Sequence, residues 1–279
     1  MPLDIIAFDL DGTTLSSSNM ISEANLDALK KAHGSGVRLV PCTGRSMYEL
    51  PGELNALIDE LGFSVFPYII TDNGAQVYDL PKRKLLYTKD IPEKRALKIL
   101  SEGRRRLAIT YGSFGIMGAA DNQGIVWEAE EAAVFVREYG RKWNLPAANL
   151  EELIKWNCGV VKISMNFADA GESKRCFEEF SSWPGLALSS SSVENIEFMQ
   201  EGISKGEALT FISGHLGIPL SRIMAIGDNH NDMEMITIAG FGVAMGNAVP
   251  ELKEKARWVT AANDEDGLAR AIEKMFAEF

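Results

Sequence analysis

The stretch IIAFDLDGTTL, residues 5–15, decides the fold. Its apolar run is typical of a buried strand, and two carboxylates, Asp9 and Asp11, follow directly, with Gly12 after them. A carboxylate at the edge of a core costs on the order of several kcal/mol unless it is paired or bound to a metal. Because residues two apart in a strand point to one side, we expect both carboxylates to face a common site where a cation compensates them.

The same pattern of an apolar strand, a polar turn and a helix recurs along the chain. VRLVPCTGR (37–45) and SRIMAIGDNHND (221–232) are apolar runs that end in polar residues, and Ser22 is a suitable N-cap for the helix between the first two strands. Strands that alternate with helices and are apolar on both faces indicate a parallel sheet with helices on both sides. The fold class is therefore α/β, with a Rossmann-like doubly wound parallel sheet.

The middle of the chain has a different pattern. PEKRALKILSEG (92–103) and GESKRCFEEFSSW (171–183) are amphipathic helices, and VVKISMNF (160–167) is an alternating strand. We therefore expect residues 1–88 and 191–279 to form the α/β core domain and residues 89–190 to form an inserted α+β domain.

Composition narrows the class of protein. Of 279 residues, 46% are hydrophobic and 24% charged, which fits a globular chain, and the net charge of −11 disfavours binding to nucleic acid or an anionic membrane. The cysteines, Cys42, Cys158 and Cys176, follow no metal-ligand pattern, and we expect no secretory signal, because the first residues show no basic segment followed by an apolar one. We expect a cytoplasmic protein that is a monomer by default, with a weak dimer as the alternative.

Ligands of an open parallel sheet bind beyond the carboxyl ends of its strands, so the polar turns that follow the strands define the candidate site. Three carboxylates near one another raise each other's pKa unless a cation neutralises them, and a set of oxygen ligands is typical of Mg²⁺. Ser204 and Glu207 have capping-box spacing, so Lys205 lies in the first turn of a helix, where an anion is favoured.

Taken together, these motifs resemble the haloacid dehalogenase (HAD) superfamily, specifically its Cof-type phosphatases. The resemblance rests on DLDGT (9–13), the threonine of CTGR (42–45), the lysine of SKGEAL (204–209) and GDNHND (227–232). It extends to TDNGAQVYD (71–79), FGVAMGNAVPELKEKA (241–256) and NDEDGLARAI (263–272). It implies a HAD-like core with an inserted C2-type cap that closes over the active site, and Mg²⁺-dependent hydrolysis of a small phosphorylated metabolite, a sugar phosphate or phosphorylated cofactor.

The resemblance also assigns a role to each site residue. Asp9 would be the nucleophile that forms an aspartyl-phosphate, and Asp11 the general acid and then the general base. Mg²⁺ would be held by Asp9, the main-chain carbonyl of Asp11 and Asp228, with Asp232 in its outer shell or orienting Lys205. The phosphoryl group would contact the remaining residues, namely Thr43, Gly44, Arg45, Asn231 and Lys205. Arg45 is equally compatible with a structural ion pair.

Three alternatives and one set of cap residues remain to be weighed. A dinucleotide-binding enzyme is rejected because no GxGxxG motif opens a helix. A phosphomutase-like phosphotransferase and a non-catalytic regulator that binds sugar phosphates stay open, although the latter has no chemical use for all of the carboxylates. Leaving-group selection would fall to cap residues, for which packing in an aromatic core is the stronger interpretation: Tyr111, Phe114, Trp127 and Glu128.

Overall fold

The computed structural model describes residues 3–46, 50–114, 125–127, 151, 154, 159–190 and 192–278. The chain folds into two compact units, Met1–Leu86 with Ser204–Phe279 and Tyr87–Ile203. The second unit extends beyond the predicted boundary at residue 190 because strand β10 (Asn195–Gln200) is hydrogen-bonded to strand β8 (Val160–Asn166).

A five-stranded parallel sheet forms the centre of the first unit, in the order β13-β12-β11-β1-β2. The predicted Rossmann-like α/β class is confirmed, because β1 pairs in parallel with strands from both ends of the chain. Its strands are β1 (Ile5–Phe8), β2 (Arg38–Pro41), β11 (Ile223–Gly227), β12 (Phe241–Ala244) and β13 (Trp258–Val259).

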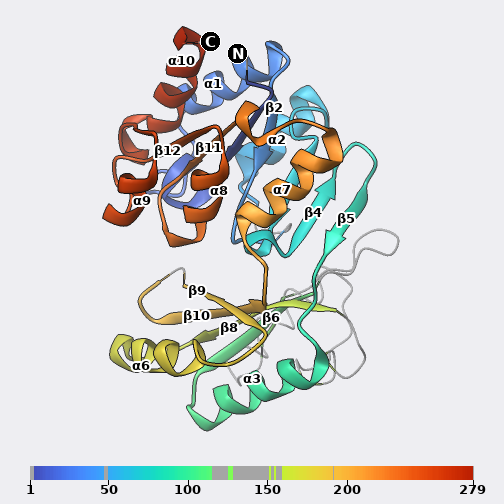
Figure 1. Cartoon of the computed structure of the whole chain (residues 1–279), viewed down its shortest axis with the longest axis vertical. Helices are drawn as coiled ribbons and strands as arrows, with labels where there is room; N and C mark the ends of the chain where they lie inside the picture. Colours follow the sequence, from blue (N-terminus) through green and yellow to red (C-terminus); the bar gives the residue numbers. More distant parts are fainter. Residues whose placement is uncertain are drawn as a thin grey trace. The chain divides into compact units, whose positions relative to one another are not determined.

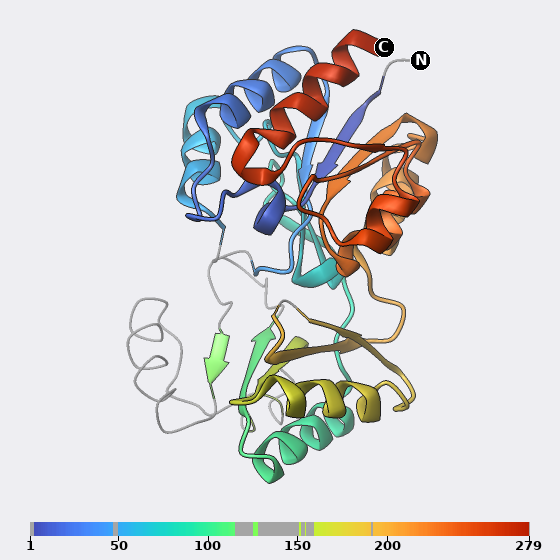
Figure 2. The same cartoon turned by 90° about the vertical axis from the view of Figure 1, so that its left-hand side faces the viewer.

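Helices cover both faces of this sheet. The β1-to-β2 and β11-to-β12 crossovers run in opposite directions from the centre, so right-handed connections place α1 and α8 on opposite faces. Figure 2 shows α1 and α10 together on one side of the strands and α7, α8 and α9 on the other. The helices are α1 (Glu23–Gly34), α2 (Gly52–Leu61), α7 (Lys205–Leu216), α8 (Met233–Ile238), α9 (Pro250–Lys255) and α10 (Gly267–Glu278).

Local sequence signals account for where these helices begin. The Ser22 side chain accepts a hydrogen bond from the Asn25 amide, and Ser204 accepts one from the Glu207 amide, so both serines act as the predicted N-caps. Pro51 precedes α2, where its fixed φ is compatible with a helix start. A small three-stranded sheet, β3-β4-β5, completes this unit beside β2 (Figure 1): β3 (Tyr68–Thr71), β4 (Gln76–Asp79) and β5 (Lys84–Thr88).

The second unit is an antiparallel sheet in the order β7-β6-β8-β10-β9, with helices α3 and α6 packed against it. Ile163 and Phe198 belong to the core between the sheet and the helices, whereas their neighbours Lys162 and Glu197 form a buried ion pair of 3.2 Å. The α+β class predicted for the insert is confirmed. Its remaining elements are α3 (Glu93–Arg105), β6 (Ile109–Phe114), β7 (Ile125–Trp127), α6 (Ala170–Phe180) and β9 (Leu186–Ser189).

In the part of the chain that the structure describes, no helix combines the length and apolar character of a membrane span.

Candidate active site

An acidic cluster lies beyond the carboxyl ends of β1 and β11. Asp9 follows β1, and Asp228 and Asp232 follow β11, and oxygen atoms of the three carboxylates lie within 4.8 Å of one another. Asp9 is 4% exposed and Asp232 is fully buried. Parallel pairing of β1 with β11 therefore produces the charge concentration that the sequence predicts at this edge.

Lys205 is the cation at the centre of the cluster. Its side chain is fully buried, and its Nζ lies 2.6 Å from Asp9 Oδ1 and 2.6 Å from Asp232 Oδ1. Burial alone lowers the pKa of Lys205, but the carboxylates of Asp232 and Asp9 raise it above its ordinary value. The ammonium group therefore stays charged and links the β1 turn to the turn after β11.

Burial raises the pKa of Asp9 well above its ordinary value, with Lys205 opposing this shift and the Asp232 and Asp228 carboxylates adding to it. Burial, followed by the Asp232 charge, raises the pKa of Asp228 to about 6. One lysine therefore does not fully compensate the charge of the cluster, which is the condition under which a further cation is favoured.

The hydrogen bonds distinguish the oxygens that are available to a metal. Asp232 uses Oδ1 for Lys205 and Oδ2 for the Asp228 and Asn229 amides, at 2.8 and 3.0 Å. Asp9 uses only Oδ1, and Asp228 accepts only from the Thr13 hydroxyl at 3.1 Å, among the described residues. One oxygen of Asp9 and one of Asp228 thus remain available, and this all-oxygen set fits Mg²⁺, whereas Asp232 has a supporting position.

Asp11 lies in a different environment from Asp9. β1 ends at Phe8, so the strand alternation that we expected does not set the directions of the two carboxylates. Asp11 is 53% exposed, and Arg45 contacts both of its oxygens, with Nε at 2.8 Å from Oδ2 and Nη2 at 2.5 Å from Oδ1. In this structure Arg45 therefore forms an ion pair with the predicted general acid.

Two glycines allow the backbone to approach the site closely. Gly12 has φ +73°, and a Cβ at this position would lie 2.4 Å from Asp228 Oδ2. At Gly44 a Cβ would lie 2.9 Å from Asn73 Oδ1. Side chains at either position would displace polar groups of the site.

Thr43 and Asn231 lie on neighbouring turns. The Thr43 hydroxyl is buried and accepts a hydrogen bond from the Arg45 amide at 3.0 Å. Asn231 donates from Nδ2 to Asn73 Oδ1 at 3.0 Å. The structure therefore brings the threonine turn and the turn after β11 to the same edge of the sheet.

Sequence reasoning assigned no role to three polar residues of this region. Thr13 binds Asp228, Asn73 binds Asn231, and Asn247 donates to the Gly12 carbonyl at 2.8 Å. All three belong to segments that carried the resemblance, but their partners are distant in sequence and no local pattern identifies them.

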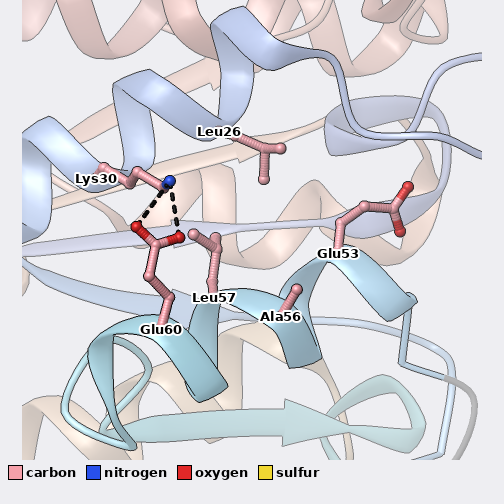
Figure 3. A pocket seen from close by; sticks show the side chains of 6 residues that line it. All are labelled: Leu26, Lys30, Glu53, Ala56, Leu57 and Glu60. Carbon is pink, nitrogen blue, oxygen red and sulfur yellow. Dashed lines mark hydrogen bonds and ion pairs between the residues drawn. The ribbon is translucent and has the colours of Figure 1, made fainter.

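Two other features of the chain, its buried cysteines and a small hollow, do not provide groups suited to binding a metal or an anion. Burial raises the pKa of the Cys42 thiol, so it stays protonated, and Cys176 is also a free thiol. A hollow of about 120 Å³ between α1 and α2 is lined by three apolar residues, Leu26, Ala56 and Leu57, and by Lys30, Glu53 and Glu60, of which Lys30 is paired with Glu60 at 2.9 Å (Figure 3). Of the predicted cap residues, Glu128 lies outside the described residues, as do the side chains of Tyr111, Phe114 and Trp127.

Comparison with known proteins supports a phosphatase site. The family model described as haloacid dehalogenase-like hydrolase matches residues 6–272. The chain is 29% identical over 294 residues to the 5-amino-6-(5-phospho-D-ribitylamino)uracil phosphatase YwtE of Bacillus subtilis (strain 168), covering 98% of each chain. It is 31% identical over 274 residues to the phosphatase YcsE of the same organism, which has the same substrate in its name, covering 97% of this chain and 94% of YcsE.

A solved structure extends the similarity to the fold. A haloacid dehalogenase-like hydrolase from Bacteroides thetaiotaomicron has a TM-score of 0.79 and 27% identity to this chain, and the match covers 98% of this chain and 100% of that one. Both units of the chain therefore have counterparts in one known protein.

Proposed function

Because this chain belongs to the haloacid dehalogenase-like hydrolases of the Cof type and is a phosphoric monoester hydrolase, we propose that it uses Mg²⁺ and an aspartyl-phosphate to hydrolyse a small phosphorylated metabolite. One observation carries the proposal: Lys205 joins Asp9 to Asp232 inside a buried acidic cluster. A structural ion pair needs one carboxylate, whereas phosphoryl transfer needs a nucleophile, a metal site and a fixed cation together.

Asp9 is the proposed nucleophile. Its Oδ1 is held by Lys205, and its other oxygen accepts no hydrogen bond from the described residues. In the first step one carboxylate oxygen of Asp9 forms a bond to phosphorus while the bond between phosphorus and the leaving oxygen breaks, and the other oxygen of the same carboxylate would hold the metal. The buried ammonium group of Lys205 stabilises the charge of the transferring phosphoryl group.

The metal would be held by Asp9, Asp228 and the main-chain carbonyl of Asp11, with Asp232 as the outer partner. Bound Mg²⁺ supplies positive charge that screens the carboxylate nucleophile from an anionic phosphate. Asp232 keeps the Asp228 and Asn229 amides in place through its Oδ2, and thereby fixes the turn that carries Asp228.

Asp11 is the proposed acid and base. It protonates the leaving oxygen as the first bond breaks, and then accepts a proton from the water that attacks the aspartyl-phosphate. That attack breaks the bond between Asp9 and phosphorus and releases inorganic phosphate. Because Arg45 contacts both carboxylate oxygens, Asp11 must leave Arg45 to carry a proton, and the guanidinium then turns to the phosphoryl oxygens.

Thr43, Gly44 and Asn231 are proposed to contact the phosphoryl group, and residues 89–190 are proposed to select the leaving group. Two relatives are named for a substrate with a phosphorylated ribityl chain, so we propose a phosphorylated polyol or sugar as the first substrate class to examine. The alternative is a phosphotransferase that passes the phosphoryl group to a second hydroxyl. Release of inorganic phosphate, which forms when water is the acceptor, distinguishes the hydrolase from this phosphotransferase.

The test measures release of inorganic phosphate from an aryl phosphate and from a panel of phosphorylated sugars, polyols and cofactors. We expect turnover that EDTA abolishes and Mg²⁺ restores, and a phosphorylated Asp9 detectable by mass spectrometry after rapid acid quench. Absence of turnover in the wild type, or undiminished turnover in Asp9→Asn, would overturn the proposal.

A further inference from the structure

The turn between β3 and β4 has a conformation that a simple hairpin does not require. Asp72, Asn73 and Gly74 have φ angles of +50°, +56° and +99°, so three successive residues lie in the left-handed region. All three are buried. Two consecutive non-glycine residues in this region are strained, and such a conformation persists only where surrounding contacts impose it.

The backbone of this turn is hydrogen-bonded to the loop after β2 that carries Thr43, Gly44 and Arg45. The Asp72 amide donates to the Arg45 carbonyl at 3.0 Å, and the Asn73 amide donates to the Thr43 carbonyl at 3.0 Å. Both amides reach these carbonyls because the chain turns left-handed at this point. The backbone on either side of Gly44 is therefore tied to the turn.

The side chain of Asn73 holds Asn231. Asn73 is 3% exposed, and its Oδ1 accepts a hydrogen bond from Asn231 Nδ2 at 3.0 Å. Asn231 Oδ1 is buried and has no hydrogen-bond partner among the described residues. A buried acceptor without a partner is unfavourable, so Asn73 imposes this orientation on the Asn231 amide. One Nδ2 hydrogen of Asn231 points to Asn73, which leaves the second for an anion.

Gly74, the third residue of the turn, lies against the start of α7, the helix that begins at Lys205. A Cβ at Gly74 would be 2.1 Å from the Ser204 carbonyl oxygen, and Ser204 is the N-cap of α7, whose first residue is Lys205. The turn thus contacts all three segments that are proposed to surround the phosphoryl group.

We propose that Asn73 is a positioning residue for phosphate binding, which acts by fixing the Asn231 amide and the Thr43 loop relative to each other. The inference rests on the proposed function, because Asn231 and Thr43 are assigned to the phosphoryl group there. It assigns to the Asn73-Gly74 turn a role in the site beyond that of a hairpin connection.

The test is Asn73→Gly, which keeps the left-handed backbone and removes only the side-chain acceptor. Asn19→Gly is the matched control, because Asn19 is an exposed asparagine at φ +59° outside the site. We measure the inhibition constant of inorganic phosphate, KM and kcat with an aryl phosphate, and the thermal unfolding midpoint. We expect Asn73→Gly to raise the inhibition constant and KM by about five- to tenfold, the effect of losing one hydrogen bond, and to lower the unfolding midpoint more than Asn19→Gly does, because the lost hydrogen bond is buried.

A double-mutant cycle separates positioning from a general structural role. In the Asn231→Ala background, Asn73→Gly should change the inhibition constant by less than about twofold, since Asn73 acts through Asn231. Additive effects, or an inhibition constant equal to that of Asn19→Gly, would overturn the inference and leave the proposed function intact. Absence of both turnover and phosphate inhibition in the wild type would instead reject the proposed function.

A second variant covers the case in which Asn73→Gly does not fold. Gly44→Ala places a Cβ 2.9 Å from Asn73 Oδ1 and displaces the same amide from the other side. We expect the same rise in the inhibition constant, and, because Gly44 is itself proposed to contact the phosphoryl group, this rise should shrink to less than about twofold in the Asn231→Ala background. An unchanged value, or a rise that persists in that background, overturns the inference.

Discussion

Arg45 binds both carboxylate oxygens of Asp11 across two loops that follow different strands, β2 and β1. The pair is partly exposed, with side-chain exposures of 27% and 53%, so it contributes little to folding. The geometry of the Arg45–Asp11 pair is more important for catalysis than for stability, because it determines where the carboxylate of Asp11, the proposed acid, lies before a substrate binds.

Replacement of Arg45 is therefore expected to affect turnover more than stability. Arg45→Met should lower kcat/KM for an aryl phosphate by about ten- to a hundredfold, and Arg45→Lys should restore little of this, because an ammonium group cannot contact two oxygens in a fork. Steady-state kinetics and urea unfolding measure the two effects. Full activity in Arg45→Lys would show that the fork geometry is irrelevant.

The residues that follow strands were the most predictable part of the site. Asp9, Lys205 and Asp228 each lie next to an apolar run or a helix cap, and these local signals place them at one edge of a parallel sheet. Ser204 is equally predictable from local sequence, since its side chain and its spacing to Glu207 predict where α7 begins.

The directions of the side chains were not predictable in the same way. Asp11 faces Arg45, and Asn73 reaches Asn231 from a turn 158 residues earlier in the chain. Such contacts depend on how loops from separate strands converge, and a single sequence contains no local pattern for them. Gly12 and Gly44 lie in the turns that the sequence predicts at the site, but the groups that they approach became evident only in three dimensions.

Lys205 supports a prediction about stability. Lys205→Met should destabilise the protein by about 3–5 kcal/mol, because it leaves the carboxylates of Asp9 and Asp232 buried without their cation. Turnover should be lost as well. Lys30→Met is the matched control, since Lys30 forms an exposed pair with Glu60 and its loss should have little effect on stability (Figure 3). Urea unfolding of the metal-free proteins measures both, and equal losses would contradict the proposed burial effect.

Gly12 supports a prediction that separates strain from crowding. Gly12 and Gly36 both have positive φ, at +73° and +83°, but a Cβ at Gly36 meets no atom within 4 Å. Alanine at either position should cost about 1 kcal/mol of stability through backbone strain. Only Gly12→Ala should also lower Mg²⁺-dependent turnover, by about tenfold or more, because its Cβ displaces Asp228. Similar kinetics for the two variants would mean that Gly12 serves the backbone alone.

Asp228 predicts how stability depends on pH in the metal-free protein. Burial is the main cause that raises the pKa of Asp228 to about 6, and the Asp232 charge is the second. An aspartate in the unfolded chain has a pKa of about 4. Between these values the folded protein holds a proton that the unfolded chain has released, so the free energy of unfolding falls as the pH rises from about 4 to 6. Asp9, whose pKa is also raised, contributes with the same sign.

Mg²⁺ should reverse this dependence, because the metal requires the deprotonated carboxylate. We expect the rise in unfolding midpoint on adding Mg²⁺ to be large above about pH 6 and to vanish as the pH falls toward about 4. Asp228→Asn should weaken the pH dependence of the metal-free protein, leaving the part that Asp9 contributes, and should remove most of the Mg²⁺ effect. Thermal unfolding in EDTA and in Mg²⁺ across this range measures both quantities. A Mg²⁺ effect that Asp228→Asn leaves intact would place the metal elsewhere and remove Asp228 from the proposed mechanism.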